Sequence, residues 1–261
     1  MSVHHQRMPV VFVGHGNPMN AIEPNEFHKS WQKLGQALPR PKAVLCISAH
    51  WETNGVAVTA ARLPETIHDF YGFPRPLFEV QYPAPGEPEL ARHTAALLEN
   101  ANVRLDEERG LDHGAWSVLA PMYPDADVPV VQLSLDSSQP AGFHYRLGRA
   151  LGPLRDEDIL IIASGNIVHN LRLLNYRDPT PPDWAVEADK EIRARIEAGD
   201  HNALIDYGSL GDAVLQGIPT NEHYLPLLYA LGLQRGDDAL HYFNTAVWGS
   251  ISMTSVVMSP G

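Results

Sequence analysis

The sequence contains almost no cysteine. Only one of its 261 residues is a cysteine, Cys46, and it lies inside an apolar run. A single thiol excludes an internal disulfide framework. A chain of this length buries roughly 70–75% of its extended surface on folding and needs no covalent staples. We therefore expect a conventional apolar core in which Cys46 is one buried residue.

Positive charge and long apolar segments are also scarce. Lysine and arginine total 19 against 31 aspartates and glutamates, and the formal net charge of −12 argues against a nucleic-acid partner. No run of about 18 apolar residues is present, so the sequence predicts no membrane span. Residues 1–7 lack the apolar segment of a signal peptide, and we expect a cytoplasmic protein.

The short motifs that mark several large enzyme classes are missing. The sequence has no HExxH, no CxxC and no phosphate-binding Walker loop. It has no GxSxG nucleophile elbow, and Gly14-His15-Gly16 is not a dinucleotide-binding fingerprint. HExxH proteases, zinc ribbons and nucleotide triphosphatases therefore have no support in the sequence.

What the sequence does contain is an alternation of apolar and amphipathic segments. Apolar, partly β-branched runs are typical of buried strands in a parallel sheet, and they occur at residues 10–13, 43–48, 128–135 and 159–163. A spacing of three to four residues between apolar positions, with capping and stop signals, predicts helices over 26–38, 87–100, 140–152 and 184–198. Further short helices are expected around 117–120 and from 220 onward.

The end of the sequence changes from this alternation to a hairpin pattern. Residues 240–247 and 250–258 alternate like paired strands around Trp248-Gly249. We predict an α/β fold in which residues 1–261 form one three-layer catalytic domain. Its central sheet is expected to be mainly parallel, with room for mixed pairing at an edge, and to carry helices on both faces.

Histidines recur where the predicted strands end or the chain turns, at positions 15, 50, 113, 169 and 223. Ligands of open α/β sheets bind beyond the carboxyl ends of the strands. A crossover helix between two parallel strands would set His15 and His50 side by side. One histidine in a tight turn is explained by a bond to a backbone carbonyl, but five in similar settings are not. Imidazole suits iron, zinc, copper and nickel, so we predict a mononuclear metal site with open coordination positions.

A long segment without helical or strand periodicity spans residues 61–86. It contains five prolines around His68-Asp69-Phe70-Tyr71. Loops of this length in a compact domain usually bind or cover a ligand. We expect His68 and Tyr71 to contact an aromatic substrate. The alternative is a proline-stiffened surface loop whose aromatic residues, and His68 with them, simply pack against the protein.

Six phrases, in order along nearly the whole chain, resemble the DOPA 4,5-dioxygenase type of class III extradiol ring-cleaving dioxygenases, and the bacterial members most of all. These phrases are Gly14-His15-Gly16-Asn17-Pro18-Met19, Ser48-Ala49-His50-Trp51, Ile67-His68-Asp69-Phe70, Leu111-Asp112-His113-Gly114, Gly165-Asn166-Ile167-Val168-His169-Asn170 and Glu222-His223-Tyr224-Leu225-Pro226-Leu227.

The resemblance implies a role for each histidine. His15, His50 and His223 match metal ligands, and Glu222 is the alternative to His223 because the wider class uses two histidines and one glutamate. His169 matches the acid/base above the metal and is expected to coordinate in a resting site as well. His113 matches a pocket histidine that contacts substrate or oxygen.

The resemblance also implies the reaction. One divalent metal per chain, Fe(II) for catalysis with Zn(II) plausible as the bound ion, would cleave catechols such as DOPA with O2 to a muconic semialdehyde. The residues by themselves leave two alternatives open: a zinc-dependent hydrolase on the same histidines, and a module that binds metal or phenols without turnover. A homo-oligomer is compatible with the sequence, which does not determine the oligomeric state.

Overall fold

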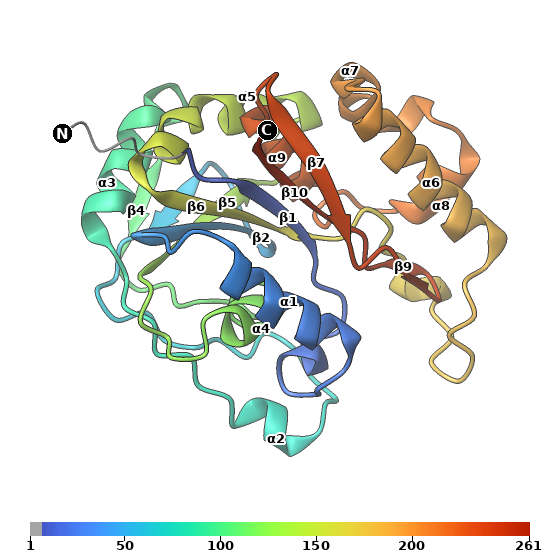
Figure 1. The fold of residues 1–261 in the computed structure, drawn as a ribbon, viewed down its shortest axis with the longest axis horizontal. Coiled ribbons are helices and arrows are strands. Elements are labelled where there is room, and N and C mark those ends of the chain that lie inside the picture. The colour runs from blue at the N-terminus through green and yellow to red at the C-terminus, as the bar shows by residue number, and fades with distance from the viewer. Residues whose placement is uncertain (1–6) are drawn as a thin grey trace.

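The computed structural model describes residues 7–261, and its centre is an eight-stranded mixed sheet (Figure 1). Residues 1–6, where the sequence predicts no signal peptide, lie outside the described part. The sheet runs in the order β4-β3-β5-β2-β6-β1-β10-β7. Its strands are β1 (Val10–Gly14), β2 (Ala43–Thr53), β3 (Ala57–Thr59), β4 (Arg104–Asp106), β5 (Val130–Asp136), β6 (Ile159–Gly165), β7 (Asp238–Phe243) and β10 (Ser255–Pro260).

The middle of the sheet is parallel, and its flanks are mixed, since β3 and β4 are parallel to each other. Strands β5, β2, β6 and β1 pair in parallel, with registers such as Leu45 opposite Ile161. Strand β3 runs antiparallel to β5, and β10 runs antiparallel to both β1 and β7. The prediction of a mainly parallel sheet with mixed edges is confirmed.

The order of the central strands differs from the expectation that β1 and β2 are neighbours. Strand β6 lies between them. Its residues Ile159–Gly165 are all buried, and a strand that is apolar on both faces is stable only in the interior of a sheet. The carboxyl ends of β1, β6 and β2 nevertheless meet at the same sheet edge.

Helices cover both faces of this sheet, as the sequence predicts (Figure 1). Helices α1 (Glu26–Ala37) and α4 (His113–Met122) pack on one face. The other face carries α3 (Pro88–Leu97), α5 (Ala141–Ala150), α6 (Asp183–Glu197) and α9 (Leu225–Leu233). The remaining short helices are α2 (Arg75–Phe78), α7 (His201–Ile205) and α8 (Asp212–Gly217). Within residues 7–261 no helix combines the length and the apolar character that crossing a membrane requires.

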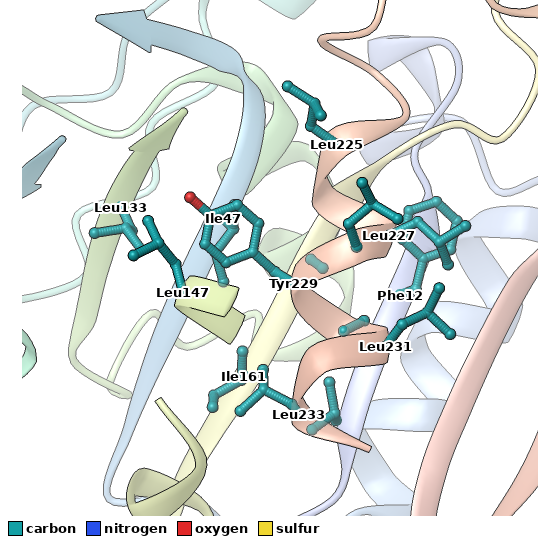
Figure 2. Packing of buried hydrophobic residues seen from close by; sticks show 14 of the residues in the cluster. Phe12, Ile47, Leu133, Leu147, Ile161, Leu225, Leu227, Tyr229, Leu231 and Leu233 are labelled. Atoms are coloured by element: carbon teal, nitrogen blue, oxygen red, sulfur yellow. The ribbon is translucent and has the colours of Figure 1, made fainter. Parts of the chain in front are cut away.

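Successive residues of each strand feed two separate cores. Val10 and Phe12 belong to the core under α9, whereas Val11 and Val13 belong to the core under α1 and α4. Figure 2 shows the leucines of α9 lying over the sheet, close to Phe12 and Ile161. Each fully buried leucine of this kind contributes about 1.5–3 kcal/mol. These two cores hold the strand ends in fixed positions.

Several boundaries differ from the sequence predictions. Helix α5 begins after Pro140 without a side-chain cap, because the Asp136 carboxylate accepts hydrogen bonds from Ser138 instead. Helix α4 begins at His113, since Asp112 caps it by accepting from the Ala115 backbone N–H. Residues 220–223 form a turn ahead of α9, which starts only at Leu225.

The C-terminal hairpin is present but is longer than the predicted turn. Strands β7 and β10 pair antiparallel, with Tyr242 opposite Val256. Between them β8 (Val247–Trp248) and β9 (Ile251–Ser252) form a small second sheet, and Gly249 makes its turn. This extension brings residues of the hairpin to the carboxyl edge of the main sheet.

Candidate metal centre and active site

Three predicted ligand histidines converge beyond the carboxyl edge of the sheet. His15 follows β1, His50 lies near the end of β2, and His223 lies in the turn before α9. The Nε2 atoms of His15 and His50 are 3.1 Å apart. Each of the three offers a ring nitrogen within 4.8 Å of the others, a spacing that a single metal ion can bridge. The structure therefore brings together residues that are far apart in the sequence.

Glycines and one asparagine set these positions. Gly16 adopts φ +58°, a left-handed conformation that glycine allows at no steric cost, and so turns the chain just after His15. A Cβ at Gly165 would collide with the carbonyl oxygen of His223. That oxygen accepts a hydrogen bond of 2.8 Å from the Asn166 backbone N–H, so the end of β6 carries the His223 turn.

Hydrogen bonds at Nδ1 orient two of the rings. Ser164 Oγ donates to the Gly114 carbonyl at 2.6 Å, so it accepts from Nδ1–H of His15 at 3.0 Å. His223 Nδ1–H donates to Glu222 Oε1 at 3.0 Å. Both rings then direct an Nε2 lone pair toward the shared space, and His223 Nε2 is buried without a hydrogen-bond partner among the described residues. Metal-binding histidines are commonly oriented in this way by an oxygen at the second ring nitrogen.

The electrostatics favour neutral rings at this centre. Burial, followed by the neighbouring imidazoles, holds the pKa of His15 and of His50 well below the usual value. Burial also lowers the pKa of His223, against the opposing influence of Glu222. Burial is the largest single influence on Glu222 and would raise its pKa, but the hydrogen bond from His223, together with the further lowering contributions of His223, the backbone and Thr220, brings the pKa to about 2. Neutral imidazole is the form that binds a metal, so the donor set fits a divalent ion.

His113 lies at the start of α4, beside the three histidines. Its ring centroid is 3.8 Å from that of His50. The His113 backbone N–H donates to Asp69 Oδ1 at 2.9 Å, and its Nδ1 lies 2.9 Å from the same oxygen. Asp69 Oδ2 is also 3.8 Å from His50 Nδ1. Sequence reasoning placed Asp69 in the aromatic loop but did not assign it a contact with either histidine.

His169 reaches the same centre from the segment after β6. Its ring stacks on His223, with centroids 3.5 Å apart and planes inclined by 10°. Burial and the neighbouring His223 lower the pKa of His169 to about 2. His169, Glu222 and His223 also offer one ligand atom each within 4.8 Å, so this side chain lies within reach of an ion as well as of a substrate.

The histidines line one cavity of about 500 Å³, which is roomy enough for a substituted catechol. Residues of the 61–86 segment form part of its wall, among them Asp69, Phe70, Tyr71 and Phe73. Tyr71 is 91% exposed, which places it at the rim.

His68 is not among the residues that line this cavity. Its Nε2 faces the Val80 carbonyl at 3.0 Å, and its ring packs against Phe70, Phe78 and Trp116. The structure thus corrects the expected placement of His68 at the cavity wall. Its contacts with these aromatic side chains keep His68 packed against the protein and away from the cavity.

A buried carboxyl group connects the strand of His50 to the helix of His113. Asp112 accepts hydrogen bonds from Ser48 Oγ at 2.6 Å and Gln132 Nε2 at 2.7 Å, and it caps α4. Burial, the largest influence, raises the pKa of Asp112. The sequence carried a signal for this role, because Asp directly before a helix is a preferred N-cap.

Comparisons with known proteins agree with this geometry. Residues 5–258 match the family described as the catalytic LigB subunit of aromatic ring-opening dioxygenase. The chain is 48% identical to 4,5-DOPA dioxygenase extradiol of Escherichia coli (strain K12) over 96% of its own length and 94% of that protein. It is 40% identical to 4,5-DOPA dioxygenase extradiol of Beta vulgaris, over 85% of each chain.

A solved structure supports the same relationship. The crystal structure of the uncharacterized protein JW3007 from Escherichia coli K12 matches with a TM-score of 0.85 and 44% sequence identity. The match covers 97% of this chain and all of that one. With a metal-competent group of three histidines at the sheet edge, this chain belongs to the LigB family of aromatic ring-opening dioxygenases and is an extradiol-type enzyme.

Proposed function

We propose that the enzyme opens the ring of catechols such as DOPA at the 4,5 bond, in one catalytic domain, with a metal held by His15, His50 and His223. One observation carries this proposal. The three side chains direct ring nitrogens into one space, and the second nitrogen of His15 and of His223 is occupied by an oxygen partner. The names of the relatives supply the substrate class, and they favour ring cleavage over the zinc hydrolase that the residues alone left open.

When bound, a divalent metal would lower the pKa of the catechol hydroxyls and supply the redox chemistry for O2. Fe(II) is the ion we propose for catalysis. The proposed triad contains no carboxylate, and such a set also binds Zn(II) well. Glu222 then serves to orient His223 through its hydrogen bond rather than as a ligand.

His169 is the residue that we propose for proton transfer. Its ring is stacked on His223 at the cavity wall, so it can accept a proton from the catechol hydroxyl on a ring nitrogen and return it as the catechol ring opens. His113, held by Asp69, orients the substrate or O2 from the side of His50. Tyr71 at the rim would cover the aromatic ring. Both oxygen atoms of O2 end in the product, which is a muconic semialdehyde.

Anaerobic reconstitution with Fe(II) or Zn(II), followed by air and a panel of catechols, tests the proposal. We expect oxygen uptake equal to the catechol consumed, and a yellow semialdehyde product. Catechol binding without oxygen uptake in the iron-loaded protein would contradict it. Greater turnover with zinc than with iron would show that Fe(II) is not the catalytic metal.

A further inference from the structure

The charged groups on the cavity wall are all of one sign. Among residues 7–261 the lining includes the carboxylates of Glu23 and Asp69, and it includes no lysine or arginine. Catechols differ mainly in the charge of the side chain that they carry. A wall with carboxylates and no cation therefore attracts a substrate whose side chain is positively charged and repels one whose side chain is negatively charged.

Only one of the two carboxylates is available to a ligand. Asp69 is engaged with the backbone N–H of His113, next to the ring of that residue. The exposed side chain of Glu23 makes no hydrogen bond and no ion pair with any described residue, and only its backbone is bonded: the N–H donates to the Met19 carbonyl and the carbonyl accepts from the Asn25 N–H. Asp69 therefore belongs to the end of the cavity that holds the catechol ring. Of the two carboxylates, Glu23 is the one without a charged or hydrogen-bonding partner among the described residues.

The polar groups around Glu23 are already paired with one another. Asn20 Nδ2 donates to the His15 carbonyl at 3.2 Å, and Asn25 Nδ2 donates to Asn20 Oδ1 at 2.8 Å. Asn25 Oδ1 in turn caps helix α1 by accepting from His28 N. This network ties the backbone on either side of Glu23 to the turn that carries His15, and from there the Glu23 side chain lines the same cavity as the histidines.

We propose that Glu23 determines substrate specificity by binding the ammonium group of a catechol's side chain, so that the enzyme selects catechols whose side chain carries an ammonium group, as in dopamine and DOPA, over those whose side chain carries a carboxylate alone. The inference rests on the proposed function and names its substrate class. A carboxylate on the substrate would meet Glu23 with no compensating cation on the wall, whereas an ammonium group forms a charge-assisted hydrogen bond. The overall charge of −12 acts in the same direction during approach.

The test compares four catechols with one ring and different side chains: dopamine, DOPA, 3,4-dihydroxyphenylacetate and the uncharged 4-methylcatechol. Dissociation constants are measured anaerobically on the metal-loaded enzyme, and KM is measured in air. In the wild type dopamine and DOPA should bind more tightly than 3,4-dihydroxyphenylacetate. Glu23→Gln should raise the dopamine Kd relative to that of 4-methylcatechol by roughly 5- to 20-fold. Glu23→Lys should reverse the preference toward 3,4-dihydroxyphenylacetate.

Glu26→Gln is the matched control. It removes the same charge three residues away, in the first turn of α1, from a side chain that does not line the cavity. This variant should keep the wild-type order of the four ligands. Tighter wild-type binding of 3,4-dihydroxyphenylacetate than of dopamine would overturn the inference, as would equal changes for dopamine and 4-methylcatechol in Glu23→Gln. Failure of all four catechols to consume O2 would overturn the proposed function instead, while the anaerobic constants would still decide the role of Glu23.

Discussion

At the scale of the residue, the second nitrogen of each imidazole decides what the ring is free to do. His15 and His223 each place Nδ1 on an oxygen and keep Nε2 for the centre. His169 has no such partner among the described hydrogen bonds, which leaves its ring nitrogens for a substrate. In the proposed mechanism, chemically identical side chains are thereby divided between holding an ion and moving a proton.

Removal of His223 and of its neighbour should therefore have unequal effects. His223→Ala deletes a nitrogen donor, and we expect folded protein without stoichiometric metal. Glu222→Gln removes only the orienting carboxylate, and loss of such a partner weakens metal affinity by about 10–100-fold. Elemental analysis of purified protein measures both, with the exposed His93→Ala as the control. The opposite order of effects would make Glu222 the ligand.

Substitution of His169 separates proton transfer from metal binding. Acid/base catalysis contributes about 10²–10⁴-fold, so His169→Gln should lower kcat by that range while metal content and anaerobic catechol binding remain. Steady-state kinetics together with metal analysis of the same sample checks this. Stoichiometric loss of metal would identify His169 as chiefly a ligand, and near-normal turnover would direct attention to His113.

Single site residues could be predicted from the sequence where a local sequence pattern marked them. Glycine turns after apolar strands identified His15 and His169, and the repeated pattern added His50, His113 and His223. The pattern could not distinguish His68, which has the same aromatic surroundings as a binding residue yet faces the Val80 carbonyl. The role of Asp69 could not be predicted, because it depends on a contact with His113, 44 positions away.

At the scale of the element, close backbone contacts decide how the helices seat on the sheet. Helix α5 packs against α9 at Gly148, where a Cβ would collide with the backbone of Tyr229. The strand segments and most helices were predictable from apolar periodicity. The placement of β6 between β1 and β2 was not predictable. Strand order depends on which apolar strand gains most from burial on both sides, and no local sequence pattern shows this.

Two glycines of α5 should respond oppositely to alanine. Gly148→Ala forces a methyl group into the Tyr229 backbone, and such overpacking costs about 1–3 kcal/mol. At Gly142 in the same helix the nearest atoms to an added Cβ are 3.4 Å and 3.5 Å away. There alanine should be neutral or stabilising by up to about 1 kcal/mol, through helix propensity. Urea unfolding measures both values, and equal effects would show that the α5–α9 contact is not tight.

At the scale of the whole molecule, a buried ion pair joins the chain's early, middle and late segments. The Arg155 guanidinium donates to both carboxylate oxygens of Asp238, at 2.6 Å and 3.0 Å, and neither side chain is exposed. Arg7 reaches the same carboxylate at 2.8 Å. Burial alone would raise the pKa of Asp238. The hydrogen bonds from Arg155 and the Arg235 backbone, together with the charges of Arg155 and Arg7, lower this pKa instead.

This pair should govern the acid stability of the fold. The pKa of Asp238 is lower in the folded protein than the ordinary value of about 3.9, so the stabilisation is present above that pH and is lost as pH falls through the folded pKa. Asp238→Asn leaves buried Arg155 without its counter-charge, and we expect a loss of about 3–5 kcal/mol at pH 7 with a flatter decline into acid.

Urea unfolding across a pH series measures this prediction. The matched control is Asp237→Asn, because Asp237 pairs with Arg7 through a side chain that is 68% exposed. That variant should keep the wild-type stability and pH profile. A wild-type profile for Asp238→Asn would show that the buried pair contributes nothing to acid stability.

The position of β1 has a consequence for the protein during its synthesis. Both sheet partners of this strand, β6 and β10, lie far downstream in the chain. At translation rates of about 5–20 residues per second, the roughly 145 residues between Gly14 and β6 take about 7–30 s to appear. For that interval an apolar strand emerges from the ribosome with both edges open, and open edges pair with other chains. Slow or stalled ribosomes should therefore yield aggregated nascent chains unless chaperones shield residues 10–14.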